Sequence, residues 1–269
     1  MKTTLIITTY NWHPALKAVL LSVLAQRTLP DEIIIADDGS SAETAELITS
    51  MRPHFSIPVI HSWQEDKGFR VSRSRNKAIA QASHEYIILI DGDIVLDKHF
   101  ISDHINIAEA GYFVTGKRVK LAQGITDDIL NAKAPQISKL CFFSKGIARG
   151  RDLALRCLWL HQKTSKTAVN SIKGIHSCNM AFWLEDAMEV NGFNAEFEGW
   201  GPEDQEFAQR LINSGKQRKI AKYYAVGYHL SHKENCRGNL QANENLLKQI
   251  QQQRTRACKL GLNEFTPQG

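Results

Sequence analysis

The chain has 269 residues, of which 43% are hydrophobic, and it carries a formal net charge of +5. This size allows a full hydrophobic core in one large or two fused α/β units, and the five scattered cysteines argue against a disulfide framework. The sequence has no uninterrupted run of about 18 apolar residues, the length that could span a membrane, and its N-terminal apolar run is too short for a signal sequence. We therefore expect a cytoplasmic protein.

The first half of the chain alternates short β-branched runs with helical patterns. The expected strands are Leu5–Thr9, Glu32–Asp37, Pro58–His61 and Tyr86–Ile90, and the expected helices lie near Pro14–Gln26, Ala42–Met51 and Ser72–Ala82. Strands that alternate with helices in this way predict an α/β fold with a mostly parallel sheet flanked by helices.

Polar residues follow three of these strands at the point where each strand ends. They are the segments Thr8–Asn11, Asp37–Ser40 and Asp91–Asp93. Ligands bind at the carboxyl ends of strands in such sheets, so we expect the three segments to converge on one crevice. The sequence has neither a G-x-G-x-x-G nor a G-x-x-x-x-G-K motif, which argues against a dinucleotide-binding dehydrogenase or a P-loop enzyme.

The triplet Asp91-Gly92-Asp93 admits two interpretations. Hard divalent cations such as Mg²⁺ take oxygen ligands and commonly bridge carboxylates to a diphosphate, and Gly92 would let phosphates approach closely. Asp-Gly is equally common in ordinary turns.

The middle of the chain is strongly basic. Residues 117–173 contain twelve Lys and Arg against three Asp and Glu, a net charge of +9 where the whole chain has +5. Apolar residues such as Trp159 are interleaved with these charges, so the segment is predicted to be amphipathic. One interpretation is a helical insertion with a solvated face, and the other is contact with an anionic membrane or another phosphate-bearing partner.

The segment Phe197–Phe207 places an indole, glycines and two adjacent carboxylates at the start of a probable helix. Pro202 fits the first helical position, which puts Glu203 and Asp204 in the first turn. The plain alternative is that both are helix-start acids, each contributing about 0.3–1 kcal/mol through the helix dipole.

Taken together, the motifs resemble family 2 glycosyltransferases of the GT-A fold, with a galactosyltransferase-like C-terminal region as in bacterial chondroitin-type synthases. The motifs are Thr8–Asn11, Ala36–Ser40, Asp66–Phe69 followed by Arg75-Asn76, Asp91–Asp93, Gly192–Asn194, Gly199–Asp204 and Tyr228-His229. The resemblance covers most of the chain. It implies one catalytic domain with a donor half at residues 1–115, an acceptor half with a helical insertion at 116–228, and a histidine with a helical tail at 229–269.

The resemblance also implies a role for individual residues. The donor nucleotide sugar would be bound by Thr8, Tyr10, Asp38, Arg75, Asn76, Asp91 and Gly92. The acceptor would contact Trp200, Gly201 and Glu203, with Trp200 stacked on a sugar ring and Asp204 as the catalytic base. Asp93 and His229 would bind Mn²⁺ or Mg²⁺, although His232 could replace His229.

The implied activity is inverting transfer of one sugar from a nucleotide sugar, expected to be UDP-linked. The acceptor would be a hydroxyl of a surface glycan, a lipopolysaccharide or a lipid-linked glycan, and no nucleic-acid partner is expected. The chain carries one such module, so transfer of a single sugar is expected rather than polymerisation. One alternative is an inactive binding protein, against which Asp93, Asp204 and His229 argue. The other is a sugar-1-phosphate nucleotidyltransferase, against which Trp200 in the expected acceptor loop argues.

Overall fold

The computed structural model describes residues 1–131, 140, 143–164, 170–233 and 238–266. Within these residues the main sheet has seven strands in the order β10-β6-β9-β4-β1-β2-β3. Strand β9 is antiparallel to both of its neighbours, and every other pairing is parallel. The strands are β1 (Thr3–Thr9), β2 (Glu32–Asp37), β3 (Val59–Trp63), β4 (Tyr86–Asp91), β6 (Tyr112–Gly116), β9 (Asn179–Trp183) and β10 (Gln217–Ala221).

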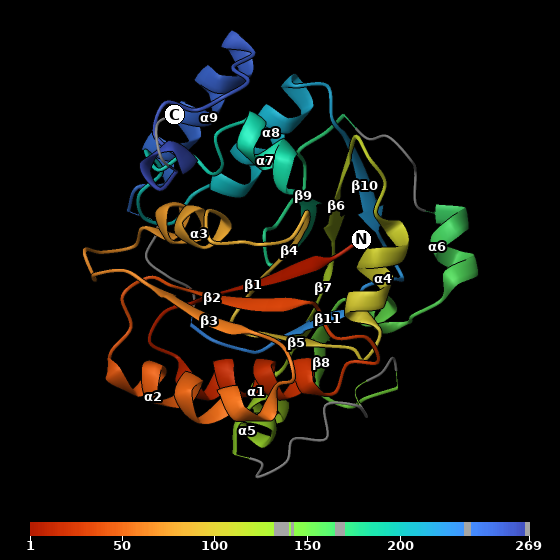
Figure 1. Ribbon diagram of the computed structural model, residues 1–269. Coiled ribbons are helices and arrows are strands. Elements are labelled where there is room, and N and C mark those ends of the chain that lie inside the picture. The colour runs from red at the N-terminus through yellow and green to blue at the C-terminus, as the bar shows by residue number, and fades with distance from the viewer. Residues whose placement is uncertain (132–139, 141–142, 165–169, 234–237, 267–269) are drawn as a thin grey trace.

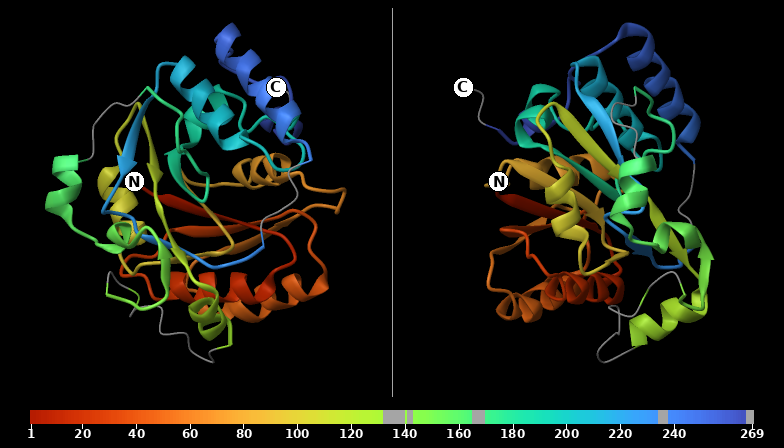
Figure 2. Two further views of the ribbon diagram at one scale, coloured as in Figure 1. Left: turned by 180° about the vertical axis from the view of Figure 1, so that it is seen from behind. Right: turned by 90° about the vertical axis from the view of Figure 1, so that its right-hand side faces the viewer.

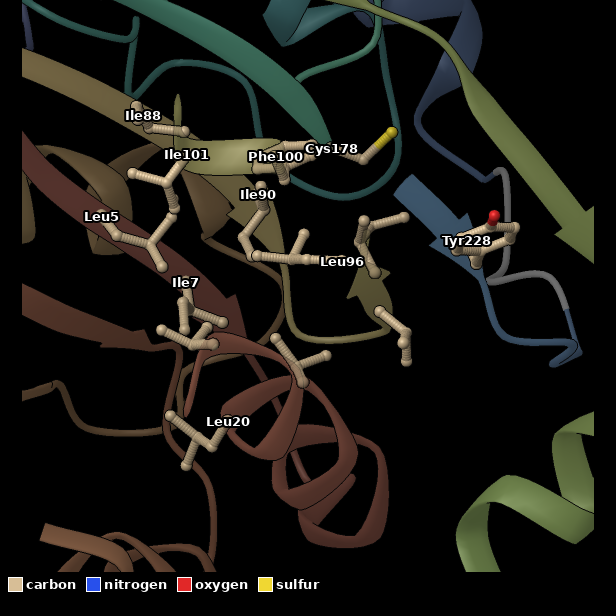
Figure 3. Packing of buried hydrophobic residues seen from close by; sticks show 14 of the residues in the cluster. Leu5, Ile7, Leu20, Ile88, Ile90, Leu96, Phe100, Ile101, Cys178 and Tyr228 are labelled. Atoms are coloured by element: carbon tan, nitrogen blue, oxygen red, sulfur yellow. The ribbon is translucent and has the colours of Figure 1, made fainter. Parts of the chain in front are cut away.

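Alternate side chains of the central strands enter two separate hydrophobic layers. In β1, Leu5 and Ile7 pack into the first layer, whereas Ile6 packs into the second. Both faces of the strand are fully buried, which explains why the sequence shows a continuous apolar run instead of an alternating pattern. Figure 3 shows the first layer, in which Leu5 and Ile7 lie beside Leu20.

Helices cover both faces of the sheet (Figure 1). The first layer is covered by α1 (His13–Leu24), α2 (Ala42–Met51), α4 (Phe100–Ile107) and α5 (Gln123–Asn131). The second is covered by α3 (Val71–Ile79), α7 (Leu184–Glu189) and α8 (Glu203–Asn213). The helix α9 (Leu240–Gln253) packs on α8, α6 (Leu158–Thr164) projects at one side, and short 3₁₀ turns occur at Arg52–His54, Arg151–Ala154 and Leu262–Glu264.

A smaller sheet lies below the main one and positions the end of β4. Its strands are β5 (Ile94–Leu96), β11 (Gly227–His229), β7 (Arg118–Leu121) and β8 (Ile147–Arg149), in the order β5-β11-β7-β8. Strand β11 runs antiparallel to β5, with His229 opposite Ile94. This register places His229 next to Asp93, although 136 residues separate them.

The sequence-based prediction of a mostly parallel sheet with flanking helices is confirmed. The basic segment includes the helices α5 and α6, and in addition its residues 118–121 and 147–149 form strands that were not predicted. Val119 and Leu121 alternate with polar residues and point into the core, which favours a strand. No helix within the described residues is long and apolar enough to cross a membrane. Figure 2 shows that α6 and the smaller sheet lie on one side of the molecule.

Candidate functional site

The three polar segments expected at the strand ends do converge. The backbone N–H of Gly92 donates a hydrogen bond to the carbonyl of Thr8 at 2.7 Å, and the N–H of Asp38 donates to the carbonyl of Thr9 at 3.1 Å. A Cβ atom on Gly92 would lie 2.9 Å from the Thr8 oxygen, so a side chain at this position would force the segments apart. Glycine is therefore required for the close approach of these two strand ends.

Arg75 connects the two sides of the crevice. It projects from α3, is buried, and its Nη1 lies 2.9 Å from Oε1 of Glu203. Its Nη2 lies 3.3 Å from Oδ1 of Asp91, and its Nε donates to Oγ1 of Thr8 at 3.4 Å. Burial raises the pKa of Asp91 to about 6, and the charge of Arg75 opposes this rise. The guanidinium thus joins the end of β4 to the start of α8.

Asp204 is oriented by backbone groups at the start of α8. The N–H of Ser177 donates to its Oδ2 at 3.1 Å, and the N–H of Gln205 donates to its Oδ1 at 2.7 Å. Burial, followed by the negative charge of Glu203, raises the pKa of Asp204 to about 8, with Arg75 acting in the opposite direction. A helix-start acid on a solvated surface would have no such shift, so the raised pKa favours a functional carboxylate. Pro202 is the N-cap residue, one position before its predicted place.

Asp93, His229 and His232 form a cluster with the chemistry of a metal site. Their candidate ligand atoms all lie within 4.8 Å of one another. The Nε2 of His232 is 3.1 Å from Oδ2 of Asp93, and that of His229 is 3.5 Å from the same atom. Oδ1 of Asp93 is buried and has no hydrogen-bond partner within the described part of the chain, as expected of an oxygen that binds a cation. Both histidines, instead of one, therefore fit as ligands.

Neighbouring groups act on the two histidines in opposite directions. Burial lowers the pKa of His229, whereas the hydrogen bond with Asp93 raises the pKa of His232. The ring of Trp12 contacts that of His232 edge-on, with 5.5 Å between the centroids.

Asp38 and Tyr10 lie at the outer end of the crevice. Gln64 Nε2 donates to Oδ1 of Asp38 at 2.6 Å, and the N–H of Arg70 donates to its Oδ2 at 2.8 Å. Tyr10 is half-exposed, and its hydroxyl donates to Oδ2 of Asp66 at 2.9 Å. The roles of Gln64 and Asp66 were not predicted, although Asp66 belongs to one of the motifs in the sequence.

Asn76 does not face the crevice, which corrects the prediction that it faces the donor. Its side chain has no exposed surface. Its Nδ2 donates to the carbonyl of Phe193 at 2.7 Å, and its Oδ1 accepts from the N–H of Phe193 at 2.8 Å. Because both amide atoms are used by this backbone, Asn76 instead fixes the turn at residues 192–194. Arg75, its neighbour on α3, is the one that reaches the crevice.

The loop at residues 198–201, named the acceptor loop after its predicted role, is fixed from outside by α9, a helix for which no role in the site was predicted. Asn239 Nδ2 and Asn243 Nδ2 each donate to the carbonyl of Glu198 at 3.1 Å. A Cβ atom on Gly201 would collide with the amide of Asn243, so this glycine lets the loop lie against α9. Trp200 in this loop is 38% exposed.

Arg118 is a further site residue that the sequence analysis did not single out. It lies at the start of β7, and its Nη1 donates to Sγ of Cys178 at 3.3 Å. Burial opposes a rise in the pKa of Arg118, but the Cys178 thiol and, to a smaller extent, the carboxylates of Asp91 and Asp93 raise it. The only signal in the sequence was the alternation of residues 118–121, which does not indicate a site.

Comparison with protein families gives two matches that together extend over residues 4–233. The family described as glycosyl transferase family 2 matches residues 4–160. The family described as N-terminal domain of galactosyltransferase matches residues 161–233.

Among curated proteins, the chain is similar to the chondroitin synthase of Escherichia coli, with 24% identity over 223 residues that cover 78% of this chain and 32% of that protein. It is similar to the hyaluronan synthase of Pasteurella multocida, with 24% identity over 78% of this chain and 23% of that protein. It is also similar to the validoxylamine A glucosyltransferase of Streptomyces hygroscopicus subsp. limoneus, with 27% identity over 78% of this chain and 48% of that protein. The chain therefore spans less than half the length of these relatives.

Solved structures show the same fold. Residues 1–349 of TarS from S. aureus superpose with a TM-score of 0.63 at 16% identity, covering 98% of this chain and 68% of that one. The mannosyltransferase PcManGT from Pyrobaculum calidifontis, in complex with GDP-Man and Mn²⁺, gives a TM-score of 0.57 at 18% identity, covering 87% of this chain and 58% of that one. The predicted GT-A fold is thereby confirmed. Because its family match covers more than half of the sequence and includes the converging strand ends, the chain belongs to glycosyl transferase family 2.

Proposed function

We propose that the chain transfers one sugar from a nucleotide sugar to a hydroxyl group of a glycan acceptor, with inversion at the anomeric carbon. The observation that carries this proposal is the position of Asp204, whose pKa is raised to about 8. It adjoins Glu203, which Arg75 links to the donor-side Asp91. A carboxylate that holds a proton near neutral pH is suited to take one from an attacking hydroxyl.

Asp204 would act as the general base. An acceptor hydroxyl must lose its proton as it attacks, and a positioned carboxylate can contribute about 10²–10⁴ in rate. The two backbone N–H groups of Ser177 and Gln205 hold the carboxylate in one orientation. A single base suffices for direct displacement, so an α-linked donor would give a β-linked product without a covalent sugar–protein intermediate.

Glu203 and Arg75 would position the acceptor end of the crevice. The ion pair between them is 2.9 Å long and mostly buried, so it keeps the start of α8 fixed against α3. Trp200 would stack on the acceptor ring from the adjacent loop. Removal of Arg75 would leave Glu203 without this partner, whereas removal of Glu203 would leave Arg75 paired with Asp91 alone.

Asp93, His229 and His232 would hold a divalent cation, Mn²⁺ or Mg²⁺. Such an ion supplies Lewis-acid stabilisation of the negative charge that develops on the departing diphosphate. The two imidazole nitrogens favour Mn²⁺ over Mg²⁺, because the harder ion prefers oxygen ligands. The Mn²⁺ in the similar PcManGT structure supports this assignment.

The donor is proposed to be a UDP-sugar. A structure of S. aureus TarS in complex with UDP-GlcNAc superposes with a TM-score of 0.60 at 17% identity. Each Asp38 oxygen accepts one hydrogen bond from the protein and keeps a lone pair for a further donor, such as the N–H on the edge of uracil. Thr8 and Tyr10 would line the nucleoside pocket beside it.

A surface beside the smaller sheet would bring the protein to an anionic membrane or lipid-linked acceptor. This basic surface consists of the exposed residues Phe143, Lys145, Arg149, Arg151, Leu158, Trp159 and Lys163. Arg156, which belongs to the same basic segment, is engaged elsewhere, because its Nε and Nη2 bind the two oxygens of Asp103 at 2.9 and 2.6 Å. Arg156 is therefore a structural residue and does not belong to the basic surface.

A panel of nucleotide sugars, scored for transfer and hydrolysis, tests the proposed function. We expect release of a nucleoside diphosphate from one donor class, and an inverted anomeric centre in the product by NMR. Release of pyrophosphate would instead support a nucleotidyltransferase, and donor binding without any release would support a binding protein. Either result would overturn the proposal.

A further inference from the structure

A group of cations without acidic partners lies beside the segment that leads to Asp204. Arg218 on β10 is 1% exposed, and its Nε donates to Oγ1 of Thr115 at 2.7 Å. Its Nη1 donates to the carbonyls of Ser171 and Lys173 at 2.7 and 3.1 Å. Its Nη2 is buried and has no hydrogen-bond partner among the described residues. Here a buried guanidinium is satisfied only by neutral oxygens.

Such an arrangement is unusual, because buried arginines are normally paired with a carboxylate. Burial lowers the pKa of Arg218 to about 10, and no acidic side chain among the described residues offsets this effect. The other two buried arginines of the site and its helices follow the ordinary rule, since Arg75 pairs with Glu203 and Arg210 with Glu206. The positive charge of Arg218 is therefore not neutralised by an acidic side chain among the described residues.

Two partly exposed lysines lie near Arg218, at the ends of the paired strands β6 and β10. Lys117 lies between β6 and β7, and its Nζ donates to the carbonyl of Gly174 at 3.3 Å. Strands β6 and β10 pair with Gly116 opposite Ala221, so Lys117 and Lys222 directly follow these residues at the same end of the two strands. Burial, followed by the charges of Arg218 and Lys222, lowers the pKa of Lys117. Lys222 follows β10, and its Nζ lies 4.6 Å from the ring centroid of Tyr223. Mutual repulsion of this kind is relieved when an anion binds.

The positive field reaches the catalytic crevice. Desolvation and the charges of Arg118, Lys117 and Lys120 lower the pKa of His176 to about 4. His176 directly precedes Ser177, whose N–H holds Asp204. Gly174, which accepts the Lys117 hydrogen bond, is three residues before Ser177, so their Cα atoms are at most about 10 Å apart. The cations thus lie on the acceptor side, within a short distance of the base.

We propose that Lys117 and Lys222, which follow the paired strands β6 and β10, form a subsite for an anionic group of the acceptor glycan, either a uronic-acid carboxylate or a phosphate. The inference rests on the proposed function and specifies its acceptor class. The subsite is separate from the basic surface, whose cations lie on β8 and α6 and in the adjoining loops. It is also separate from the proposed diphosphate position, which lies at Asp93.

Calorimetric binding of four probes to the full chain tests the subsite. The probes are a glucuronic acid–N-acetylhexosamine disaccharide, its neutral carboxamide, a hexose phosphate and the parent hexose. The variant Lys117→Gln/Lys222→Gln removes both exposed charges, and Lys117→Arg/Lys222→Arg retains them. Lys173→Gln is the matched control, because Lys173 is exposed on the same segment and only its backbone contacts Arg218.

The probes form two pairs, the uronic acid with its carboxamide and the hexose phosphate with its hexose. In one of these pairs we expect the anionic probe to bind more tightly than the neutral one. The double Gln variant should lose roughly tenfold in affinity for each lysine, as is typical of a hydrogen bond to a charged group. The Arg variant and Lys173→Gln should bind almost as the wild type does. The pair that discriminates identifies the carboxylate or the phosphate as the ligand.

Equal binding within both pairs, or an unchanged double Gln variant, would overturn the subsite. A double Gln variant that loses affinity for the nucleotide sugar as well would also overturn it, because the cations would then serve the donor. These results are independent of turnover. Failure of the proposed function would instead appear as a wild-type chain that binds the probes but releases no nucleoside diphosphate.

Discussion

The Asp204 carboxylate accepts hydrogen bonds from two backbone N–H groups and yet has a raised pKa. Both hydrogen bonds favour the charged form, but burial and the adjacent Glu203 outweigh them. The sequence indicated a pair of acids at a helix start but could not indicate which of them would have a raised pKa. That distinction depends on the burial of Asp204 in the folded chain, which outweighs the opposing effects of Ser177 and of Arg75, a residue 129 positions away in the sequence.

The pH dependence of kcat/KM should follow this carboxylate. The base must be deprotonated, so we expect kcat/KM to rise with pH and to level off above about 8. In Glu203→Gln the neighbouring negative charge is absent, so the rise should move to lower pH. A pH–rate profile of both proteins checks this, and a wild-type rate that is already constant from pH 5 upward would contradict it.

The same shift has a consequence for stability. The pKa of Asp204 is about 8 in the folded chain, above the ordinary value of 3.8. As pH rises, the unfolded chain therefore releases the carboxyl proton of Asp204 before the folded chain does. The contribution of Asp204 to stability is therefore full below about pH 4 and is lost progressively up to about pH 8. Urea unfolding should show the wild type losing stability relative to Asp204→Asn across this interval. A difference that does not change with pH would contradict the raised pKa.

Both histidines at the proposed metal site should contribute to Mn²⁺ affinity. Ligand histidines must be neutral, and the raised pKa of His232 lets protons compete as pH falls. We expect His229→Ala and His232→Ala each to weaken binding by at least about 10–100-fold, with weaker wild-type binding at pH 6 than at pH 8. Titration of Mn²⁺, with the exposed His54→Ala as control, measures this. Unchanged affinity in His232→Ala would leave His229 and Asp93 as the ligands.

At the scale of elements, long strands and helices were predictable, whereas short elements were not. The apolar run of β4 and the helical spacing of α8 can be read directly from the sequence. Strand β11 has three residues, and its position depends on pairing with β5 and β7. Likewise, α9 reads as an ordinary polar helix, and its contacts with the acceptor loop arise only from its packing on α8. Local patterns cannot encode such long-range placement.

The contact between α9 and the acceptor loop should affect acceptor binding selectively. Asn243→Ala removes a buried amide that donates to Glu198, so we expect a higher acceptor KM and a stability loss of about 1 kcal/mol, with donor affinity unchanged. Asn245→Ala, on an exposed position of the same helix, is the matched control. Steady-state kinetics and urea unfolding check both variants. An unchanged acceptor KM in Asn243→Ala would show that the loop does not depend on α9.

At the scale of the whole molecule, the sequence predicted the fold and the convergence of strand ends, because both follow from the order of strands and helices. It also predicted a basic segment between residues 117 and 173, but it could not divide that segment. The structure separates it into cations beside the crevice, such as Lys117, a structural ion pair at Arg156, and the basic surface. Charge along a sequence does not specify the direction in which each side chain points.

The basic surface should bind vesicles that contain acidic lipids. Each cation near such a membrane contributes about 1 kcal/mol, so binding should be reversible and should weaken in salt. We expect Lys145→Gln/Arg149→Gln/Arg151→Gln to lose binding in a vesicle co-sedimentation assay while retaining donor affinity. A control that neutralises the exposed Lys248, Arg256 and Lys259 removes the same charge from α9 and the residues that follow it. Equal binding to neutral and acidic vesicles would exclude the membrane.

The central claim, that Asp204 is the catalytic base, is tested most directly by single-turnover kinetics of Asp204→Asn with saturating donor, metal and acceptor. We predict a loss of about two to four orders of magnitude in the transfer rate, with donor affinity retained and the fold intact by circular dichroism. A helix-start acid would instead cost less than about 1 kcal/mol of stability and leave the rate nearly unchanged. A folded Asp204→Asn variant that transfers sugar within a few-fold of the wild-type rate would contradict the account.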